Sequence, residues 1–370
     1  MQVRNESRPD RVHLRDLTLD ELQGFVRSYD LPDYRYRQIA SWLYDKQVGD
    51  FAEMTDLPLA LRDRLGQDAS VAALHTRTMQ ISALDGTKKF LFELGDGNLI
   101  ESVLMRHDRR ITFCVSSQVG CPLDCVFCQT GKGVFGRNLT AGEIIDQISA
   151  LKKTCADDVD KVNVVFMGMG EPMLNLPHVA RAIQIMNDPA GFDMGSRRIT
   201  VSTVGHPRRM RQLADMSLRC SMALSLNATT DSQRGRLMPA VSSYTVTELI
   251  DAARYFAEKS GRRVTLEYVL LKGLNTSIAD AKRLGKLSRK GPFKINLIPY
   301  NAGRDTAYET LSEDEIQEFI RGILPYASSV TVRRSKGPDI DAACGQLWTK
   351  SLLSRKKPAR AVSPPGDTAL

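Results

Sequence analysis

Residues 111–128 read Ile-Thr-Phe-Cys-Val-Ser-Ser-Gln-Val-Gly-Cys-Pro-Leu-Asp-Cys-Val-Phe-Cys, an apolar strand followed by a loop that carries three thiols. Cys121, Cys125 and Cys128 are separated by three and by two residues. A tetrahedral zinc site takes four ligands, and an ordinary iron–sulfur cluster is held by four thiolates. Three thiols on one loop therefore predict a [4Fe–4S] cluster whose fourth iron is open to another ligand. The alternatives are a zinc site with a distant fourth ligand, or buried thiols without a metal.

The composition is that of a soluble globular protein. The chain has 370 residues, of which 25% are charged and 42% are hydrophobic, and this length suits one domain of about 200–250 residues plus a smaller one. No run of roughly 18 apolar residues occurs, and the N-terminus lacks the apolar segment of a signal peptide. We therefore expect a cytoplasmic protein without a membrane partner. Its seven cysteines, an odd number, then favour metal or redox chemistry over a disulfide framework.

The charge balance is basic. Lysine and arginine number 51 against 43 aspartate and glutamate residues, which gives a formal net charge of +8. The excess is concentrated in residues 331–360, and further adjacent basic pairs are scattered along the chain. A single such pair is most often a solvated surface. Together, the pairs and the C-terminal segment favour a nucleic-acid partner.

The N-terminal part is expected to form a small helical domain over residues 1–85. Thr18-Leu-Asp-Glu21 is a capping box, and residues 36–44 carry apolar side chains at helical spacing. Residues 87–105 alternate like strands around an Asp96-Gly97 turn, so we expect a β connector over residues 86–108. At the other end, residues 349–370 are predicted to be a basic, disordered tail.

Between these parts, apolar strands alternate with helical segments. Helices are expected to start near Thr140, Leu176, Pro207, Thr245 and Ser277, and a last helix spans residues 312–324. Continuous apolar strands separated by helices predict a parallel sheet, and six or seven such units indicate a closed or partly closed α/β barrel. The predicted strands are 111–115, 162–167, 199–202, 221–226, 264–271, 294–299 and 330–333.

Special residues follow the ends of these strands, where parallel barrels place their active sites. The cysteine loop follows the first strand and the turn Gly168-Met-Gly-Glu-Pro172 the second, and Cys344 comes shortly after the seventh. The turn lacks the third glycine of a dinucleotide fingerprint, but beside an open iron its carboxylate and backbone would suit an amino-acid ammonium. Short polar residues at strand ends also serve as turns or caps, so they are weaker candidates. These are Ser202, Ser225, Asn227 and Asn301.

The cysteine loop, with Phe127 before its last thiol, resembles that of radical S-adenosylmethionine (SAM) enzymes, and Gly168–Pro172 resembles their SAM-amino-group motif. Over nearly the whole chain, to about Trp348, the sequence resembles the RlmN family, which methylates adenine C2 in RNA. The further segments that carry this resemblance are Glu101-Ser-Val, Cys114-Val-Ser-Ser-Gln-Val-Gly-Cys121, Leu224-Ser-Leu-Asn-Ala228, Leu297-Ile-Pro-Tyr-Asn301 and Asp339-Ile-Asp-Ala-Ala-Cys-Gly-Gln-Leu347.

The resemblance implies a fold, cofactors and partners. The fold is a radical SAM partial (α/β)6 barrel over residues 109–348 with a catalytic C-terminal segment, and residues 1–85 would bind RNA. The cofactors are one [4Fe–4S] cluster, held by Cys121, Cys125 and Cys128, and SAM. The substrates are 23S ribosomal RNA, at the peptidyl-transferase centre, and transfer RNA, at the adenosine 3′ of the anticodon. A monomer supplied with electrons by a donor such as flavodoxin and flavodoxin reductase is expected.

The resemblance also implies roles for single residues. Cys344 takes a methyl group from SAM, a radical formed from a second SAM removes hydrogen from it, and the methylene carbon adds to C2. Cys114 then resolves the protein–RNA crosslink and forms a transient disulfide with Cys344. Glu101 resembles the proton acceptor, although Cys114 is an alternative base. The implied SAM contacts are Gly170, Glu171, Ser202, Ser225, Leu226, Asn227 and Asn301, and at Asn227, where many relatives have His, an amide replaces an imidazole.

Two other classes of protein are weighed against this enzyme. An iron–sulfur electron carrier has no use for an open iron, and a zinc-stabilised RNA-binding protein would be colourless and contain zinc. Neither class explains Cys114 and Cys344. Within the enzyme class, a related methyltransferase that modifies adenine C8 with the same two cysteines stays open, because the motifs do not separate C2 from C8.

Overall fold

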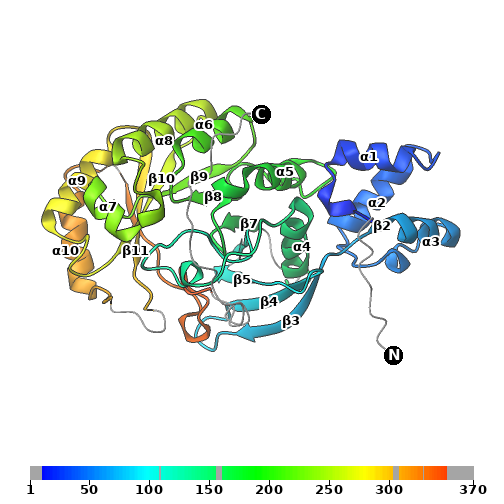
Figure 1. The fold of residues 1–370 in the computed structure, drawn as a ribbon, viewed down its shortest axis with the longest axis horizontal. Coiled ribbons are helices and arrows are strands. Elements are labelled where there is room, and N and C mark those ends of the chain that lie inside the picture. Colours follow the sequence, from blue (N-terminus) through cyan, green and yellow to red (C-terminus); the bar gives the residue numbers. More distant parts are fainter. Residues whose placement is uncertain (1–10, 108–109, 156–160, 303–307, 328, 348–370) are drawn as a thin grey trace.

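The computed structural model describes residues 11–107, 110–155, 161–302, 308–327 and 329–347. The tail predicted over residues 349–370 lies outside them. A ten-stranded sheet in the order β12-β11-β10-β9-β8-β7-β6-β5-β4-β3 forms the centre of the molecule, and helices cover the outer face of its parallel part (Figure 1). Among the described helices, none is long and apolar enough to cross a membrane.

Seven neighbouring strands of this sheet are parallel, as the sequence predicts. The two edge strands, β3 and β12, are not paired with each other in the described sheet, so the barrel is partial. The predicted α/β fold class is therefore confirmed. The parallel strands are β6 (Arg110–Cys114), β7 (Lys161–Phe166), β8 (Ile199–Thr203), β9 (Ser221–Ser225), β10 (Val264–Leu270), β11 (Phe293–Pro299) and β12 (Val330–Val332).

The outer helices begin where their local signals place them. Capping boxes at Thr140, Thr245, Ser277 and Ser312 each close with the acidic residue three positions later. The helices are α4 (Ala141–Lys152), α5 (Leu176–Asn187), α6 (Pro207–Asp215), α7 (Asp231–Leu237), α8 (Val246–Ser260), α9 (Ile278–Ser288) and α10 (Glu313–Ile323). Of these, α7 was not predicted, because its seven residues include a glycine and are too few to show a helical period.

The N-terminal segment contains α1 (Leu19–Arg27), α2 (Tyr34–Tyr44) and α3 (Leu59–Asp68), and two short strands, β1 (Val12–His13) and β2 (Ala69–Ser70). Three antiparallel strands follow and extend the barrel sheet. They are β3 (Leu74–Ile81), β4 (Lys88–Leu94) and β5 (Leu99–His107).

The strand β3 corrects the expectation that residues up to about 85 are mainly helical. Only Leu74 of its eight residues is buried. An edge strand with two solvent-facing sides has no alternating apolar pattern, and the period-2 signal was therefore absent. The limits of the helical domain and the β connector stay a prediction.

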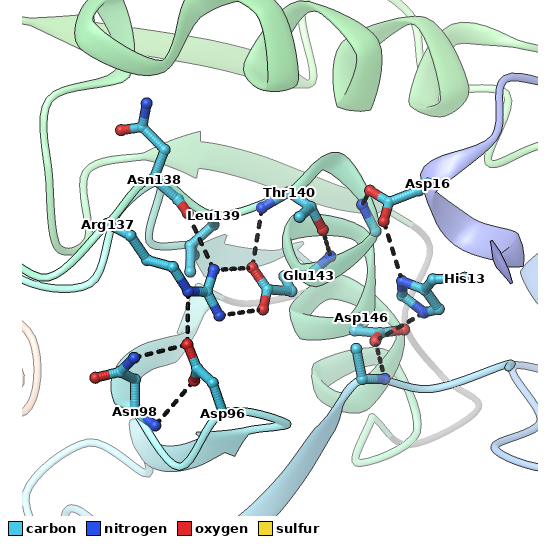
Figure 2. A network of polar contacts seen from close by, with 12 residues as sticks. His13, Asp16, Asp96, Asn98, Arg137, Asn138, Leu139, Thr140, Glu143 and Asp146 are labelled. Carbon is cyan, nitrogen blue, oxygen red and sulfur yellow. Dashed lines mark hydrogen bonds and ion pairs between the residues drawn. The ribbon is translucent and has the colours of Figure 1, made fainter. Parts of the chain in front are cut away.

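A buried polar network joins the N-terminal helices to α4 (Figure 2). Arg15 Nη1 donates to Asp146 Oδ1 at 2.7 Å, and both side chains are 2% exposed. His13 Nε2 lies 3.3 Å from Asp146 Oδ2. The close approach needs a glycine at 142, because a Cβ there would lie 2.2 Å from His13 Nδ1. The N-terminal helices are thus held against the barrel helix that follows the cysteine loop.

The same network continues toward the sheet (Figure 2). Arg137, at the end of the cysteine loop, forms two 2.7 Å hydrogen bonds to the Glu143 carboxylate and a third of 2.7 Å to Asp96 in the β4–β5 turn. Planar two-bond pairing of this kind fixes orientation as well as distance. The loop end, α4 and the antiparallel strands are therefore one connected unit.

His13 is expected to make the stability of this junction depend on pH. Burial disfavours its charge, but the Asp146 carboxylate, with a smaller effect of Asp16, outweighs burial and raises the pKa of His13 from 6.5 to about 10. A raised pKa stabilises the folded protein below the unfolded pKa, and this contribution is lost as pH rises through the folded value. His13→Gln should therefore lower the free energy of unfolding by roughly 2–4 kcal/mol below pH 6.5 and have little effect above pH 10.

Urea unfolding of the two proteins across this pH range measures the difference. His75→Gln is the matched control, because His75 is exposed on β3, and it should show no such pH dependence. A loss of equal size at pH 6 and pH 10 for His13→Gln would contradict the assignment.

Candidate active site

The cysteine loop follows β6 and is shaped by backbone contacts to its neighbours. Ser117 N and Gln118 N both donate to Met169 O, at 2.9 and 3.2 Å, and Val126 N donates to Leu237 O at 3.0 Å. Gly120 has φ +71, and a Cβ there would lie 2.2 Å from Val134 O. The loop therefore folds tightly over the end of the sheet, with its thiols on the cavity side.

The three predicted ligand thiols line one cavity of about 910 Å³ at the carboxyl ends of the strands. All three are free thiols. Burial and the charge of Cys128 raise the pKa of Cys121, and burial and the other two thiols raise the pKa of Cys125. Bound iron would reverse this balance, because a coordinating thiol is deprotonated.

The donor set fits a cluster. Among the described residues, no group of three His, Cys, Asp or Glu side chains is arranged to hold a single metal ion. Each thiolate of a [4Fe–4S] cube needs to reach only its own iron. Three thiols spread around one cavity meet that need and leave one iron for another ligand.

The turn from Gly168 to Pro172 lies beside the thiols and lines the same cavity. A Cβ at Gly168 would lie 2.7 Å from Val115 O, and Gly170 has φ +98, so both positions require glycine. The Glu171 carboxylate accepts bonds from Met173 N and Val204 N, each at 3.0 Å. Burial raises the pKa of Glu171 despite these bonds. Its carboxylate thus joins the turn to the end of β8.

The predicted strand-end residues Ser202, Ser225, Asn227 and Asn301 also line this cavity. The hydroxyls of Ser202 and Ser225 are 3.4 Å apart. Asn227 has φ +55, and its Oδ1 accepts a bond from Val269 N at 3.0 Å. Leu226 is fully buried and is not among the lining residues. The strand ends therefore converge as barrel geometry predicts.

Two residues at or beside the cavity, Glu267 and Arg234, were not predicted from the sequence. Glu267 lines the cavity from β10, where it is 5% exposed and accepts a 3.1 Å bond from Ser202 Oγ. A lone carboxylate inside an apolar strand was the available signal, since such a charge is rarely buried without a role. Arg234, from the unpredicted helix α7, is fully buried and donates to Leu226 O at 2.7 Å. Arg234 thus supports the loop after β9.

Cys344 lies at the boundary of two cavities. It lines the cavity of the three thiols and also a second one of about 640 Å³, which it shares with Cys114 and Arg333. Burial and the charge of Cys344 raise the pKa of Cys114 to about 12, and Arg333 opposes the shift. The structure thus brings together two free thiols that are 230 residues apart in sequence.

Glu101 is placed differently from the other predicted residues. It is buried on β5 and belongs to the lining of neither cavity. Its Oε1 lies 3.5 Å from Lys89 Nζ. The carboxylate therefore faces a lysine beside the cavities.

Comparison with known proteins agrees with this geometry. The family model of the radical SAM superfamily matches residues 115–284. That of the ribosomal RNA large subunit methyltransferase N-terminal domain matches residues 12–71. The two matches cover the cysteine loop with most of the barrel, and the N-terminal helices.

Similar proteins cover nearly the whole chain. A dual-specificity RNA methyltransferase RlmN from Geobacter sulfurreducens is 45% identical over 95% of this chain and 95% of its own length. A probable enzyme of the same name from Thermotoga maritima is 43% identical over 93% of this chain and 99% of its own. The crystal structure of a radical SAM methyltransferase from Sphaerobacter thermophilus has a TM-score of 0.87 and 40% identity, with coverage of 91% of this chain and 99% of that one.

Proposed function

The chain belongs to the RlmN family of radical SAM RNA methyltransferases, and we propose that it methylates C2 of an adenosine in 23S ribosomal RNA and in transfer RNA. The observation that carries this proposal is Cys344, which lines both the cavity of the three thiols and the cavity of Cys114. A group at that boundary reaches a methyl donor on one side and a resolving thiol on the other.

The family implies a [4Fe–4S] cluster and SAM, and the site suits both. Cys121, Cys125 and Cys128 would hold the cluster, and the glycine turn, Ser202, Ser225, Asn227 and Asn301 would hold SAM. When bound, these groups supply a methyl group and a radical that removes hydrogen from it. Leu226, the remaining predicted SAM contact, is buried and does not line the cavity, so its contact stays a prediction.

Adenine C2 explains why the protein carries the methyl group itself. This carbon is neither nucleophilic nor bonded to an acidic hydrogen, so it does not attack the methyl of SAM directly. The Cys344 thiolate attacks that methyl carbon instead and becomes S-methylcysteine, while the bond from the carbon to the sulfonium sulfur breaks and S-adenosylhomocysteine leaves. After one of its hydrogens is removed, the same carbon adds to C2 and links Cys344 to the RNA, and one electron of the adduct would pass to the cluster.

The thiol of Cys114 then releases the methylated RNA from Cys344. Cys114 attacks the Cys344 sulfur, the bond between that sulfur and the methylene carbon breaks, and a disulfide joins the two cysteines. A disulfide formed in each turnover needs an external reductant, for which a flavodoxin and its reductase are proposed. The C2 proton goes to a base, for which Glu101 and Cys114 are the two candidates.

The net charge of the chain bears on its partners, location and oligomeric state. A net charge of +8 favours a polyanionic substrate, and the N-terminal helices are the proposed additional RNA surface. RNA substrates and a labile catalytic disulfide suit a cytoplasmic enzyme. A monomer is proposed, because the three cluster thiols, Cys114, Cys344 and the polar strand-end residues all line cavities of one chain.

The product nucleoside tests the proposed function. The reconstituted protein is incubated with SAM, a reductant and either 23S ribosomal RNA or transfer RNA, and each RNA is digested and analysed by chromatography and mass spectrometry. We expect 2-methyladenosine from both RNAs. Finding 8-methyladenosine would assign the chain to C8 chemistry, and product from one RNA alone would remove the dual specificity.

A further inference from the structure

The segment that carries Cys344 depends on outside contacts for its position. Between β12 and Leu347 it contains one short 3-10 helix, η6 (Pro338–Ile340). Gly337, Asp341 and Gly345 have left-handed backbones, with φ of +60, +52 and +82. For Asp341, a residue with a Cβ, this conformation persists only when neighbours enforce it.

The turn between β3 and β4 provides one set of these contacts. Asp339 accepts bonds from Ser82 Oγ at 2.6 Å and Ala83 N at 3.0 Å. Gly337 N donates to Asp85 Oδ2 at 3.1 Å. These partners are about 250 residues away along the chain. The antiparallel strands of the sheet therefore hold the loop that carries Cys344 in place.

Lys89 provides a further contact, to the residues just before Cys344. Its Nζ donates to Asp341 O at 3.4 Å and lies 3.5 Å from Glu101 Oε1, with side-chain exposures of 11% and 8% for the two charged groups. The carbonyl it binds belongs to the left-handed residue three positions before Cys344. A buried lysine thus joins the sheet carboxylate to the loop of the reactive thiol.

The strand register places these groups on one face of the sheet. Leu91 pairs with Glu101, Lys89 with Val103, and Val103 with Cys114. Directly paired side chains point to the same side of a sheet, and alternate residues of one strand share a face. Lys89, Glu101 and Cys114 therefore share the face of the sheet from which Lys89 contacts the Cys344 loop.

We propose that Glu101 and Lys89 are positioning residues, which form a buried strut that fixes the Cys344 loop through the Asp341 carbonyl. The proposal deepens the proposed function, since it assigns Glu101 to loop placement in place of proton transfer. Three observations carry it: the carboxylate contacts a lysine, the lysine contacts the loop, and Glu101 lines neither cavity.

The strut has a kinetic consequence at the first chemical step. Methyl transfer to Cys344 needs its sulfur in line with the methyl carbon, and a displacement of about 1 Å costs up to roughly 100-fold in rate. Lys89→Met and Glu101→Gln are therefore both expected to slow S-methylation of Cys344 about 10- to 100-fold. No RNA is present at that step, so a base for the C2 proton is not needed there.

The experiment measures S-methylation of Cys344 by peptide mass spectrometry in reconstituted protein without RNA. Lys88→Met is the matched control, because Lys88 lies on the opposite face of β4 and donates to Thr154 O at the end of α4. It should methylate Cys344 at the wild-type rate. Lys89→Arg keeps the charge and the donor and should restore most of the rate.

A second measurement reports on the loop without cofactor chemistry. Hydrogen exchange in the protein without cluster should be faster at residues 341–346 in Lys89→Met than in Lys88→Met. Asp339→Asn, which weakens the other anchor, should show the same faster exchange. Equal rates of hydrogen exchange in these three variants would contradict the proposed strut.

A role of Glu101 as proton acceptor predicts a different result. If Glu101 is the proton acceptor, Glu101→Gln methylates Cys344 normally and accumulates the Cys344–RNA crosslink, whereas Lys89→Met does not. That result would overturn the proposal and leave the proposed function intact. A wild-type protein that never methylates Cys344 would contradict the proposed function itself, and the exchange measurement would still test the strut.

Discussion

Replacing Cys344 by alanine is expected to abolish RNA methylation, to less than about one thousandth of the wild-type rate. Cys344 is the thiol on the boundary between the two cavities, and in the proposed mechanism no other group carries the methyl carbon to C2. The variant should still assemble its cluster and bind RNA, because Cys121, Cys125 and Cys128 are untouched. Methyl transfer from labelled SAM to RNA measures the loss.

The control for this prediction is Cys155→Ala. Cys155 lies after the end of α4, where its thiol contacts Leu151 O at 3.6 Å, and it belongs to the lining of neither cavity. This variant should methylate RNA at the wild-type rate. Full activity of Cys344→Ala would refute the mechanism proposed for the family chemistry in this chain.

Replacing Cys125 by alanine is expected to remove the cluster. Cys125 is buried in the centre of the loop, 8% exposed, and a cube with two protein ligands has lost one of three anchors. Iron content should fall at least about tenfold, the brown colour should disappear, and RNA methylation should be lost with it. Iron and zinc are measured together after anaerobic reconstitution.

Cys220→Ala is the matched control for metal content. Cys220 is also buried, at 1% exposure, but it lies directly before β9, and Cys220 is not part of the cavity lined by the three thiols. Its iron content should equal that of the wild type. Stoichiometric zinc in the wild-type protein, lost in Cys125→Ala, would instead support the zinc-stabilised alternative.

Most of the fold could be predicted because its signals are local. The four capping boxes act within four residues, and the parallel strands are mostly apolar, so neither signal depends on the rest of the chain. The edge strand β3 and the short helix α7 carried no such signal. Both are stabilised by neighbours: β3 by pairing with β4, and α7 by the buried contacts of Arg234.

The candidate site shows the same division. Residues at or just after the ends of strands, such as Ser202 and Asn301, were predicted to converge because parallel strands end at one edge. The sequence did not predict that Glu267 and Arg333 would line the cavities. Their positions depend on which side chains turn inward and on the path of the C-terminal segment.

The sequence by itself indicated a metal-binding cysteine loop and the order of most strands and helices, because thiol spacing and hydrophobic period are short-range properties. Only the tertiary structure decided that Cys344 borders both cavities, that Cys114 shares one of them, and that Glu101 faces Lys89. The first two relations join segments more than 200 residues apart, and packing of the C-terminal segment on the rest of the sheet creates them. Glu101 meets Lys89 because β4 and β5 are paired. No local pattern encodes that packing.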